Sequence, residues 1–133
     1  MSSTDFYLNP LPDDFREKLR AKLQKKSVST ETGCRLWTGY IENGGRGYGS
    51  LKVPSHVEEG RVTLQVHRLA YFVEVNIRLT PSIHVSHLCG VKACVNVDHL
   101  SYEPAVVNSQ RNTCFAAGQC FSHGRYRACL LLQ

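Results

Sequence analysis

The sequence lacks several features that would place a protein in a familiar class. No hydrophobic run approaches the roughly 20 residues that a membrane-spanning helix needs. The N-terminus has neither the basic nor the apolar stretch of a secretory signal, so we expect an intracellular protein. Acidic residues are scarce in residues 61–133, which hold three against seven basic ones, whereas residues 1–60 hold eight against nine. This half therefore carries most of the formal charge of +5, which favours a polyanionic partner.

The composition predicts one folded domain. The chain has 133 residues, of which 42% are hydrophobic and 20% are charged. These values are typical of a single globular domain and not of a disordered chain. We expect residues 1–30 to form an N-terminal arm, loose over residues 1–10, and a helix. The helix should run from about residue 12 to residue 26. Apolar residues recur every four positions from the residue that precedes it: Leu11, Phe15, Leu19 and Leu23.

Residues 34–66 predict a twisted antiparallel sheet. Strand-like runs cover residues 34–41, 48–53 and 61–66, and the glycine-rich residues 42–47 resemble a hairpin turn. In the last run Arg61, Thr63 and Gln65 alternate with three apolar residues, so one face of the sheet should be polar. Such a face suits phosphates and base edges, although an ordinary solvated face has the same pattern.

Beyond this sheet the pattern changes twice. Residues 66–75 predict a buried helix, and residues 78–81 predict a connection, whereas residues 27–33, before the sheet, predict a polar loop. Residues 82–113 then predict a strand, an irregular loop, a second strand at 99–103 and a helix from about residue 104. Residues 114–133 have no regular periodicity, so we expect them to need a metal to hold them.

Six cysteines are the most informative feature of the chain. An even number allows three disulfides, and buried free thiols are a second alternative. A reducing compartment disfavours disulfides, and histidines interleaved with cysteines at short intervals are typical of metal ligands. Two closed Cys3His sites use every cysteine, and the mixed ligands favour two structural zinc ions. The first set would be Cys34, Cys89, Cys94 and His99, and the second Cys114, Cys120, His123 and Cys129.

Several motifs resemble the His-Cys box homing endonucleases, members of the ββα-metal (HNH-like) nuclease superfamily. The specific part comprises residues 86–89 (Ser-His-Leu-Cys), residues 94–100 with their Asp-His-Leu ending, and the positions of Asn108, Arg111 and Cys114. Residues 34–37, 47–49 and 66–71 are similar to the N-terminal pattern of this family. The resemblance implies an α+β fold, with a ββα-metal motif at residues 82–113, an antiparallel DNA-binding sheet at 34–66 and a second zinc-bound segment at 114–133.

The resemblance also implies a hydrolytic site. His87 would be the general base that takes a proton from the attacking water. Asn108 would bind one catalytic Mg²⁺ through its amide oxygen, and DNA and water would complete the coordination. An arginine would contact the phosphate: Arg61 is our choice, with Arg35, Arg46 and Arg68 as alternatives. His84, three residues earlier on the strand, is the alternative base.

The implied activity is metal-dependent cleavage of double-stranded DNA to 5′-phosphate and 3′-hydroxyl ends, in the nucleus. The alternative is a zinc-stapled DNA-binding module without cleavage, similar to the MH1 domains of Smad proteins. The longer C-terminal tail that dimerising members use is missing, which leaves a homodimer as an open expectation. The expected DNA contacts lie on the polar side of residues 34–66: Arg35, Arg46, Lys52, Arg61, Thr63 and Gln65.

Overall fold

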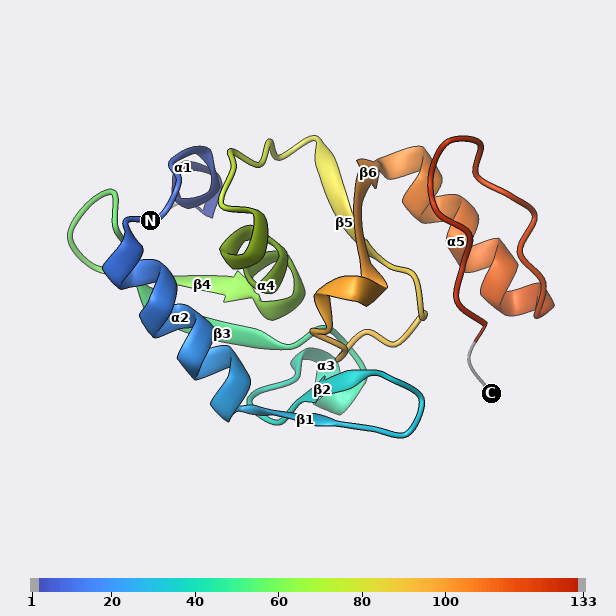
Figure 1. The fold of residues 1–133 in the computed structure, drawn as a ribbon, viewed down its shortest axis with the longest axis horizontal. Helices are drawn as coiled ribbons and strands as arrows, with labels where there is room; N and C mark the ends of the chain where they lie inside the picture. The colour runs from blue at the N-terminus through green and yellow to red at the C-terminus, as the bar shows by residue number, and fades with distance from the viewer. Residues whose placement is uncertain (1–2, 132–133) are drawn as a thin grey trace.

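The computed structural model describes residues 3–131, which form an elongated α+β molecule (Figure 1). The first half contains α1 (Ser3–Leu8), α2 (Asp13–Lys25), β1 (Ser27–Ser29), β2 (Arg35–Trp37), α3 (Glu42–Gly45) and β3 (Ser50–Pro54). The second half contains β4 (Arg61–Gln65), α4 (Val66–Val75), β5 (Ile83–His87), the 3₁₀ turn η1 (Val97–His99), β6 (Leu100–Pro104) and α5 (Ala105–Ala117). None of the helices in residues 3–131 is long and apolar enough to cross a membrane.

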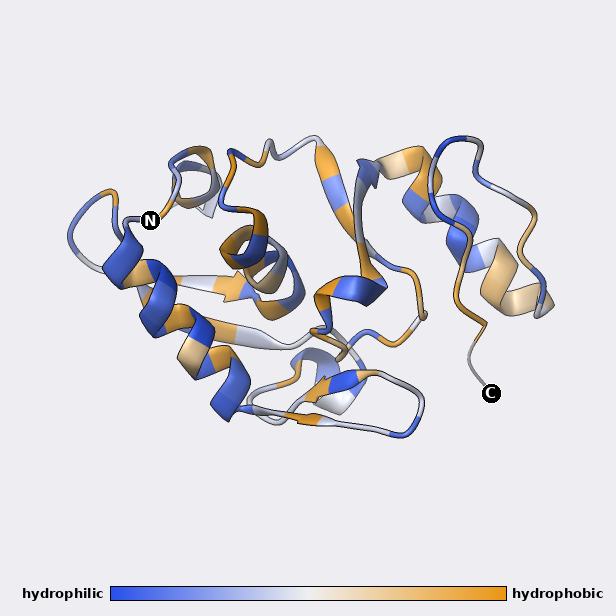
Figure 2. Ribbon diagram, viewed as in Figure 1, coloured by the Kyte–Doolittle hydropathy of each residue, from blue (hydrophilic) through white to orange (hydrophobic). Residues whose placement is uncertain are grey.

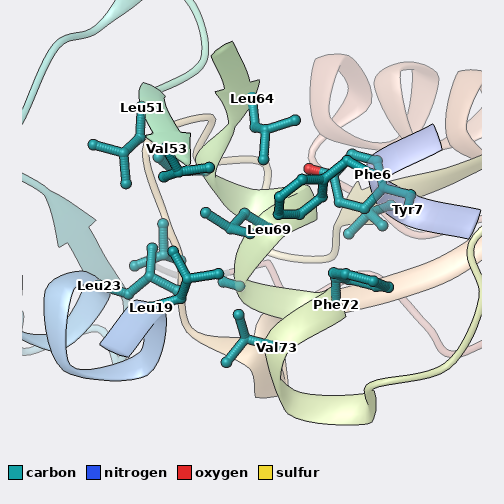
Figure 3. Packing of buried hydrophobic residues seen from close by; sticks show 14 of the residues in the cluster. Phe6, Tyr7, Leu19, Leu23, Leu51, Val53, Leu64, Leu69, Phe72 and Val73 are labelled. Atoms are coloured by element: carbon teal, nitrogen blue, oxygen red, sulfur yellow. The ribbon is translucent and has the colours of Figure 1, made fainter. Parts of the chain in front are cut away.

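The hydrophobic core lies around α4. Figure 3 shows side chains of α4, α2, β3 and β4 converging with Phe6 and Tyr7 of α1. The expectation of a loose arm at residues 1–10 is therefore wrong for its described part. Phe6 and Tyr7 are almost completely buried, and the Leu79 N–H donates to the Tyr7 carbonyl at 2.8 Å. These two buried aromatic side chains anchor the short helix α1 to the core.

The predicted helix at about residues 12–26 and the predicted buried helix at residues 66–75 are confirmed. Acidic side chains begin α2, and Lys22 and Lys25 end it, as the helix dipole favours. Hydrophilic residues dominate α2 and hydrophobic ones α4 in Figure 2, in keeping with a covering helix and a central one. At the end of α4, Asn76 adopts a left-handed conformation (φ 47°), and its side chain bonds to both the N–H and the carbonyl of Leu11.

The predicted single sheet at residues 34–66 is instead divided. β3 pairs with β4, but β2 pairs with β1, in the segment expected to be a polar loop. Between β2 and β3 lies the short segment α3, which is a tight turn more than a regular helix, because Asn43 and Gly44 adopt left-handed dihedral angles (φ 54° and 64°). The expected hairpin is reduced to a bridge between Ile41 and Gly49, flanked by hydrogen bonds from the Glu42 N–H to the Tyr48 carbonyl and from the Ser50 N–H to the Tyr40 carbonyl, both 2.9 Å. The predicted polar face is therefore confined to a two-stranded ribbon.

The predicted strand–loop–strand–helix motif is present. β5 and β6 pair antiparallel from His87 opposite Leu100 to Ile83 opposite Pro104, and α5 packs against both strands. α5 runs four residues beyond the expected end, and the C-terminal segment folds back beside it (Figure 1). The Leu130 N–H donates to the Leu88 carbonyl at 2.7 Å, which ties this segment to the end of β5.

Candidate active site and metal centres

The first metal cluster joins three distant segments of the chain. Cys34 precedes β2, Cys89 and Cys94 lie in the loop after β5, and His99 ends η1. Their ligand atoms all lie within 4.8 Å of one another, and all four residues are buried. The His99 Nδ1 lies 3.6 Å from both the Cys34 and the Cys94 sulfur. The structure thus brings together the complete first set that the spacing predicted.

Backbone hydrogen bonds hold this cluster in place. The Trp37 N–H donates to the Ala93 carbonyl at 2.9 Å, and the Val95 N–H donates to the Arg35 carbonyl at 2.7 Å. β2 therefore runs beside the cysteine loop. The Leu88 N–H donates to the His99 carbonyl at 2.7 Å, which closes the loop at the start of the β5–β6 hairpin.

The pKa values of the three thiols in the first cluster are shifted by burial and by one another, and this arrangement favours a bound cation. A hydrogen bond from the Cys89 thiol lowers the pKa of Cys94 to about 4, and the same bond raises the pKa of Cys89. Burial and the nearby Cys94 raise the pKa of Cys34. Three buried sulfurs so close together can all be thiolates only beside a positive charge. Three thiolates and one imidazole form a typical closed zinc site.

The second metal cluster is formed within a short stretch. Cys114 lies in the last turn of α5, and Cys120, His123 and Cys129 follow in the C-terminal segment. The His123 Nε2 lies 3.5 Å from the Cys114 sulfur and 3.3 Å from the Cys129 sulfur. The other ring nitrogen, Nδ1, donates to the Gln110 Oε1 at 3.0 Å, which leaves Nε2 as the ligand atom. This set also fits zinc, so both predicted ligand sets are present.

A buried ion pair connects the second cluster to the β5–β6 hairpin. Arg111 of α5 is 1% exposed and donates to both carboxylate oxygens of Glu103 on β6, at 2.5 and 2.8 Å. Its Nη1 also donates to the Cys129 sulfur at 3.3 Å, and its Nη2 to the Arg127 carbonyl at 2.8 Å. Burial favours a protonated Glu103, but the hydrogen bonds and the positive charge of Arg111 lower the pKa of Glu103 below its usual value.

A hollow of about 400 Å³ lies where α4, β5 and α5 meet. Asn108, on the second turn of α5, is half-buried at its edge. The Asn108 Nδ2 lies 3.4 Å from the Nδ1 of His84, an exposed residue of β5. The polar groups of the hollow come from α1, residues 48–68, β5 and α5: Ser3, Thr4, Tyr7, Tyr48, Gln65, His67, Arg68, His84 and Asn108.

His87 lies behind the wall of this hollow. Its ring is buried. The centroid of the His87 ring lies 4.4 Å from that of His67 and 5.7 Å from that of Tyr48, on which it stacks, and both of these residues line the hollow. The His87 Nε2–H donates to the Cys94 carbonyl at 3.0 Å, so the first zinc loop fixes the orientation of the ring. Burial lowers the pKa of His87 to about 4 and lowers that of His67 well below its usual value. Both rings are therefore neutral near pH 7, and each has one ring nitrogen that can accept a proton.

The structure does not bring Arg61 to the hollow. Arg61 begins β4 and donates to the Lys52 carbonyl at 3.0 Å, whereas Gln65, which lines the hollow, ends that strand. Four residues of strand separate the two by about 13 Å. Of the four arginines considered, only Arg68 lines the hollow, where it donates to the Ile83 and Thr80 carbonyls at 2.8 Å.

The expected DNA contacts fall into two groups. Lys52, Arg61, Thr63 and Gln65 are exposed on the β3–β4 ribbon, and Arg46 is exposed just after α3. Arg35 is instead half-buried, and it donates to the Ser27 Oγ at 2.6 Å and to the carbonyls of Gln24 and Ser27. These bonds hold α2, β1 and β2 together, so Arg35 has a structural role, and its contact with DNA stays a prediction.

Sequence reasoning missed parts of this arrangement. His67 and Tyr48 had only a place in the N-terminal pattern of the family, and Arg68 was only an alternative contact to the phosphate. Their positions in the hollow depend on how α4 crosses β5, which no local pattern records. A histidine and an arginine at the start of an otherwise apolar helix were the available signal.

The sequence profile of a family described as "Zinc-binding loop region of homing endonuclease" matches residues 33–130, well over half of the chain. The protein therefore belongs to this family of homing endonuclease zinc-binding domains. Comparison with curated proteins and with solved structures found no match. The match contains all eight ligands of the two clusters, together with His87 and Asn108.

Proposed function

We propose that the protein is a metal-dependent endonuclease that hydrolyses phosphodiester bonds of double-stranded DNA, giving 5′-phosphate and 3′-hydroxyl ends. The observation that carries this proposal is the hollow lined by Asn108, His84 and His67, with the His87 ring packed against His67, in a chain of a homing endonuclease family. The net charge of +5 suits a polyanionic substrate.

His87 is the general base of this proposal. Its Nε2–H bond to the Cys94 carbonyl fixes the tautomer, so Nδ1 carries the lone pair that accepts the proton of the attacking water. The low pKa keeps the ring unprotonated in the free protein. A phosphate anion bound nearby raises this pKa towards the working pH, because an adjacent negative charge favours the imidazolium. His84 is the competing base, and mutation separates the two.

Asn108 is the protein ligand for a hard divalent cation, with Mg²⁺ as our choice. An amide oxygen is a suitable donor for such an ion, and a half-buried position at the edge of a hollow leaves room for DNA oxygens and water. When bound, the ion would supply charge stabilisation at the phosphate and at the leaving 3′-oxygen. α5 fixes Asn108, and Arg68 replaces Arg61 as the arginine proposed beside the phosphate.

The β3–β4 ribbon is the proposed DNA-binding surface. Its exposed residues run from Gln65 at the hollow to Arg61 about 13 Å away, a length of about four base pairs. Lys52 and Thr63 lie opposite each other between these ends. A two-stranded ribbon fits the major groove, so the surface would guide DNA to the hollow. Arg46 extends the same set of contacts.

Cleavage of a supercoiled plasmid by the zinc-loaded protein tests the proposal. Mg²⁺ is omitted or added without chelator, so that the zinc ions stay in place, and ligation of the products reports their 5′-phosphates. We expect cleavage only with Mg²⁺, and a loss of about 10²–10⁴-fold in His87→Ala that added metal does not rescue. Asn108→Ala should be partly rescued by high Mg²⁺ or by Mn²⁺, whereas Ser109→Ala, beside it on α5, should cleave normally.

Two results would overturn parts of this proposal. Tight, salt-dependent DNA binding without cleavage under any divalent ion would leave a DNA-binding module similar to Smad MH1 domains. Normal cleavage by His87→Ala together with none by His84→Ala would move the base to His84. Zinc content and circular dichroism of each variant show that the fold is intact.

A further inference from the structure

Asn108 has two chemically different ends, and the structure shows which one faces His84. Its amide nitrogen Nδ2 lies 3.4 Å from the His84 Nδ1. An amide NH2 group only donates hydrogen bonds, so in this contact the ring nitrogen serves as the acceptor, as it does in the tautomer that carries its proton on Nε2. This contact leaves the amide oxygen Oδ1, the metal-binding end, free of His84.

The backbone holds this pair in register. His84 lies on β5 opposite Glu103 of β6, and Glu103 is bonded to Arg111, three residues beyond Asn108 on α5. The strand that carries His84 and the helix that carries Asn108 are thus fixed by a buried ion pair. The His84 side chain itself is exposed, so it is not needed to fill the core.

We propose that His84 is a positioning residue: it accepts a hydrogen bond from the Asn108 amide nitrogen and thereby presents the amide oxygen to the divalent cation. Without this acceptor the amide rotates about its terminal bond and offers nitrogen or oxygen to the ion. This inference rests on the proposed function, because it requires Asn108 to bind a cation. It assigns His84 no proton transfer and no contact with the reacting atoms.

Three substitutions of His84 test whether Asn108 needs a hydrogen-bond acceptor at the position of the His84 Nδ1, or only an acceptor nearby. In His84→Asn the side-chain oxygen takes about the place of Nδ1, so an acceptor remains. In His84→Gln the oxygen reaches the place of Nε2, and His84→Ala has no acceptor. We expect His84→Ala and His84→Gln to weaken the cation about tenfold, the lower end of the effect of removing an outer-sphere partner. His84→Asn should bind the cation nearly as the unmodified protein does.

Two measurements report on the cation. Electron paramagnetic resonance follows Mn²⁺ binding to the zinc-loaded protein in complex with a cleaved duplex, with the duplex alone and Asn108→Ala as controls. Single-turnover cleavage over a range of Mg²⁺ gives the metal dependence and the rate at saturation. We expect His84→Ala and His84→Gln to need about tenfold more metal in both measurements while reaching a rate close to that of the unmodified protein.

The outcomes are distinguishable. Unchanged Mn²⁺ binding and Mg²⁺ dependence in His84→Ala and His84→Gln overturn the inference while cleavage by the unmodified protein upholds the proposed function. Loss of cleavage at every metal concentration in all three variants, with Mn²⁺ binding unchanged, also overturns it and makes His84 the base. Absence of cleavage in the unmodified protein refutes the proposed function, and the Mn²⁺ measurement then decides the inference by itself.

Discussion

The two metal clusters have the same ligand types and serve different parts of the molecule. The first joins Cys34 to a loop 55 residues further along the chain, and all its ligands are buried. The second closes within 15 residues of Cys114, and its Cys120 is only half-buried. A ligand set that closes a long loop replaces long-range packing, whereas one that closes a short loop holds a local segment.

The contacts around each cluster also indicate that the first joins distant parts of the chain and that the second holds a local segment. The first cluster lies where β2, the cysteine loop and the β5–β6 hairpin meet, near the middle of the molecule (Figure 1). The second lies at one end of the molecule and reaches the hairpin through Arg111 and the Leu130–Leu88 bond. We therefore expect the first cluster to control folding and the second to control how α5, with Asn108, sits on the hairpin.

The largest expected effect comes from removing one ligand of each cluster. Zinc in small domains contributes on the order of 10 kcal/mol, comparable to the whole stability of a domain. Cys94→Ala should therefore unfold the protein, while Cys120→Ala should lose one zinc ion and keep its core. Near-ultraviolet circular dichroism and zinc content measure both. A folded Cys94→Ala, or an unfolded Cys120→Ala, contradicts the division of roles.

The second expected effect concerns the ion pair between α5 and β6. Arg111→Met should lower the free energy of unfolding by about 3–5 kcal/mol, because Glu103 is left as a buried, unpaired charge. Arg20→Met, which removes the exposed pair with Glu17, should cost at most about 1 kcal/mol. Urea unfolding measures both. If the combined Arg111→Met and Glu103→Leu variant is no more stable than Arg111→Met, the buried charge is not the cause.

A smaller effect is expected beside the first cluster. A Cβ at Gly49 would lie 2.6 Å from both Trp37 and Val66, so Gly49→Ala should cost about 1–3 kcal/mol through overpacking. Gly44→Ala is the control, since no atom lies within 4 Å of its Cβ and only its positive φ opposes a side chain. Thermal unfolding compares them. A greater loss in Gly44→Ala would show that backbone strain, and not packing against Trp37, dominates.

The smallest expected effect is a pH dependence of the second region. The pKa of Glu103 is lowered in the folded protein, so its contribution to stability is present above its unfolded pKa and is lost as the pH falls through its folded pKa. Stability should fall more steeply on acidification in the unmodified protein than in Glu103→Gln. Urea midpoints between pH 6 and pH 3.5 measure the slopes. Equal slopes would mean that other groups, such as the zinc ligands, cause the acid sensitivity.

The parts of the fold that could be predicted are those that leave a local pattern in the sequence, such as a hydrophobic period or a spacing of metal ligands. The helix at Val66–Val75 and both ligand sets followed from periodicity and from cysteine–histidine spacing. α1 was missed because Phe6 and Tyr7 alone show no period. The division of the sheet depends on two left-handed residues, Asn43 and Gly44, which curl a segment that reads as a hairpin turn.

The candidate site was only partly predictable for a similar reason. Asn108 was identified from its place after the second strand, but its contact with His84 depends on the packing of α5 against β5. The choice of Arg61 followed strand alternation, which places a side chain on a face but not at a position along it. Arg68 reaches the hollow because α4 crosses β5 there, and the Glu103–Arg111 pair joins elements whose contact no spacing shows.

Stepwise removal of zinc tests the central claim most directly. A chelator is titrated into the zinc-loaded protein while zinc release, the fluorescence of the single tryptophan Trp37 and DNA cleavage are recorded on the same samples. We predict that the first equivalent of zinc leaves the second cluster, whose Cys120 is only half-buried, and that this abolishes cleavage without changing the fluorescence of Trp37. The second equivalent should leave with unfolding. Release of both ions in one step with a change in Trp37, or full cleavage after the first is lost, would contradict the account.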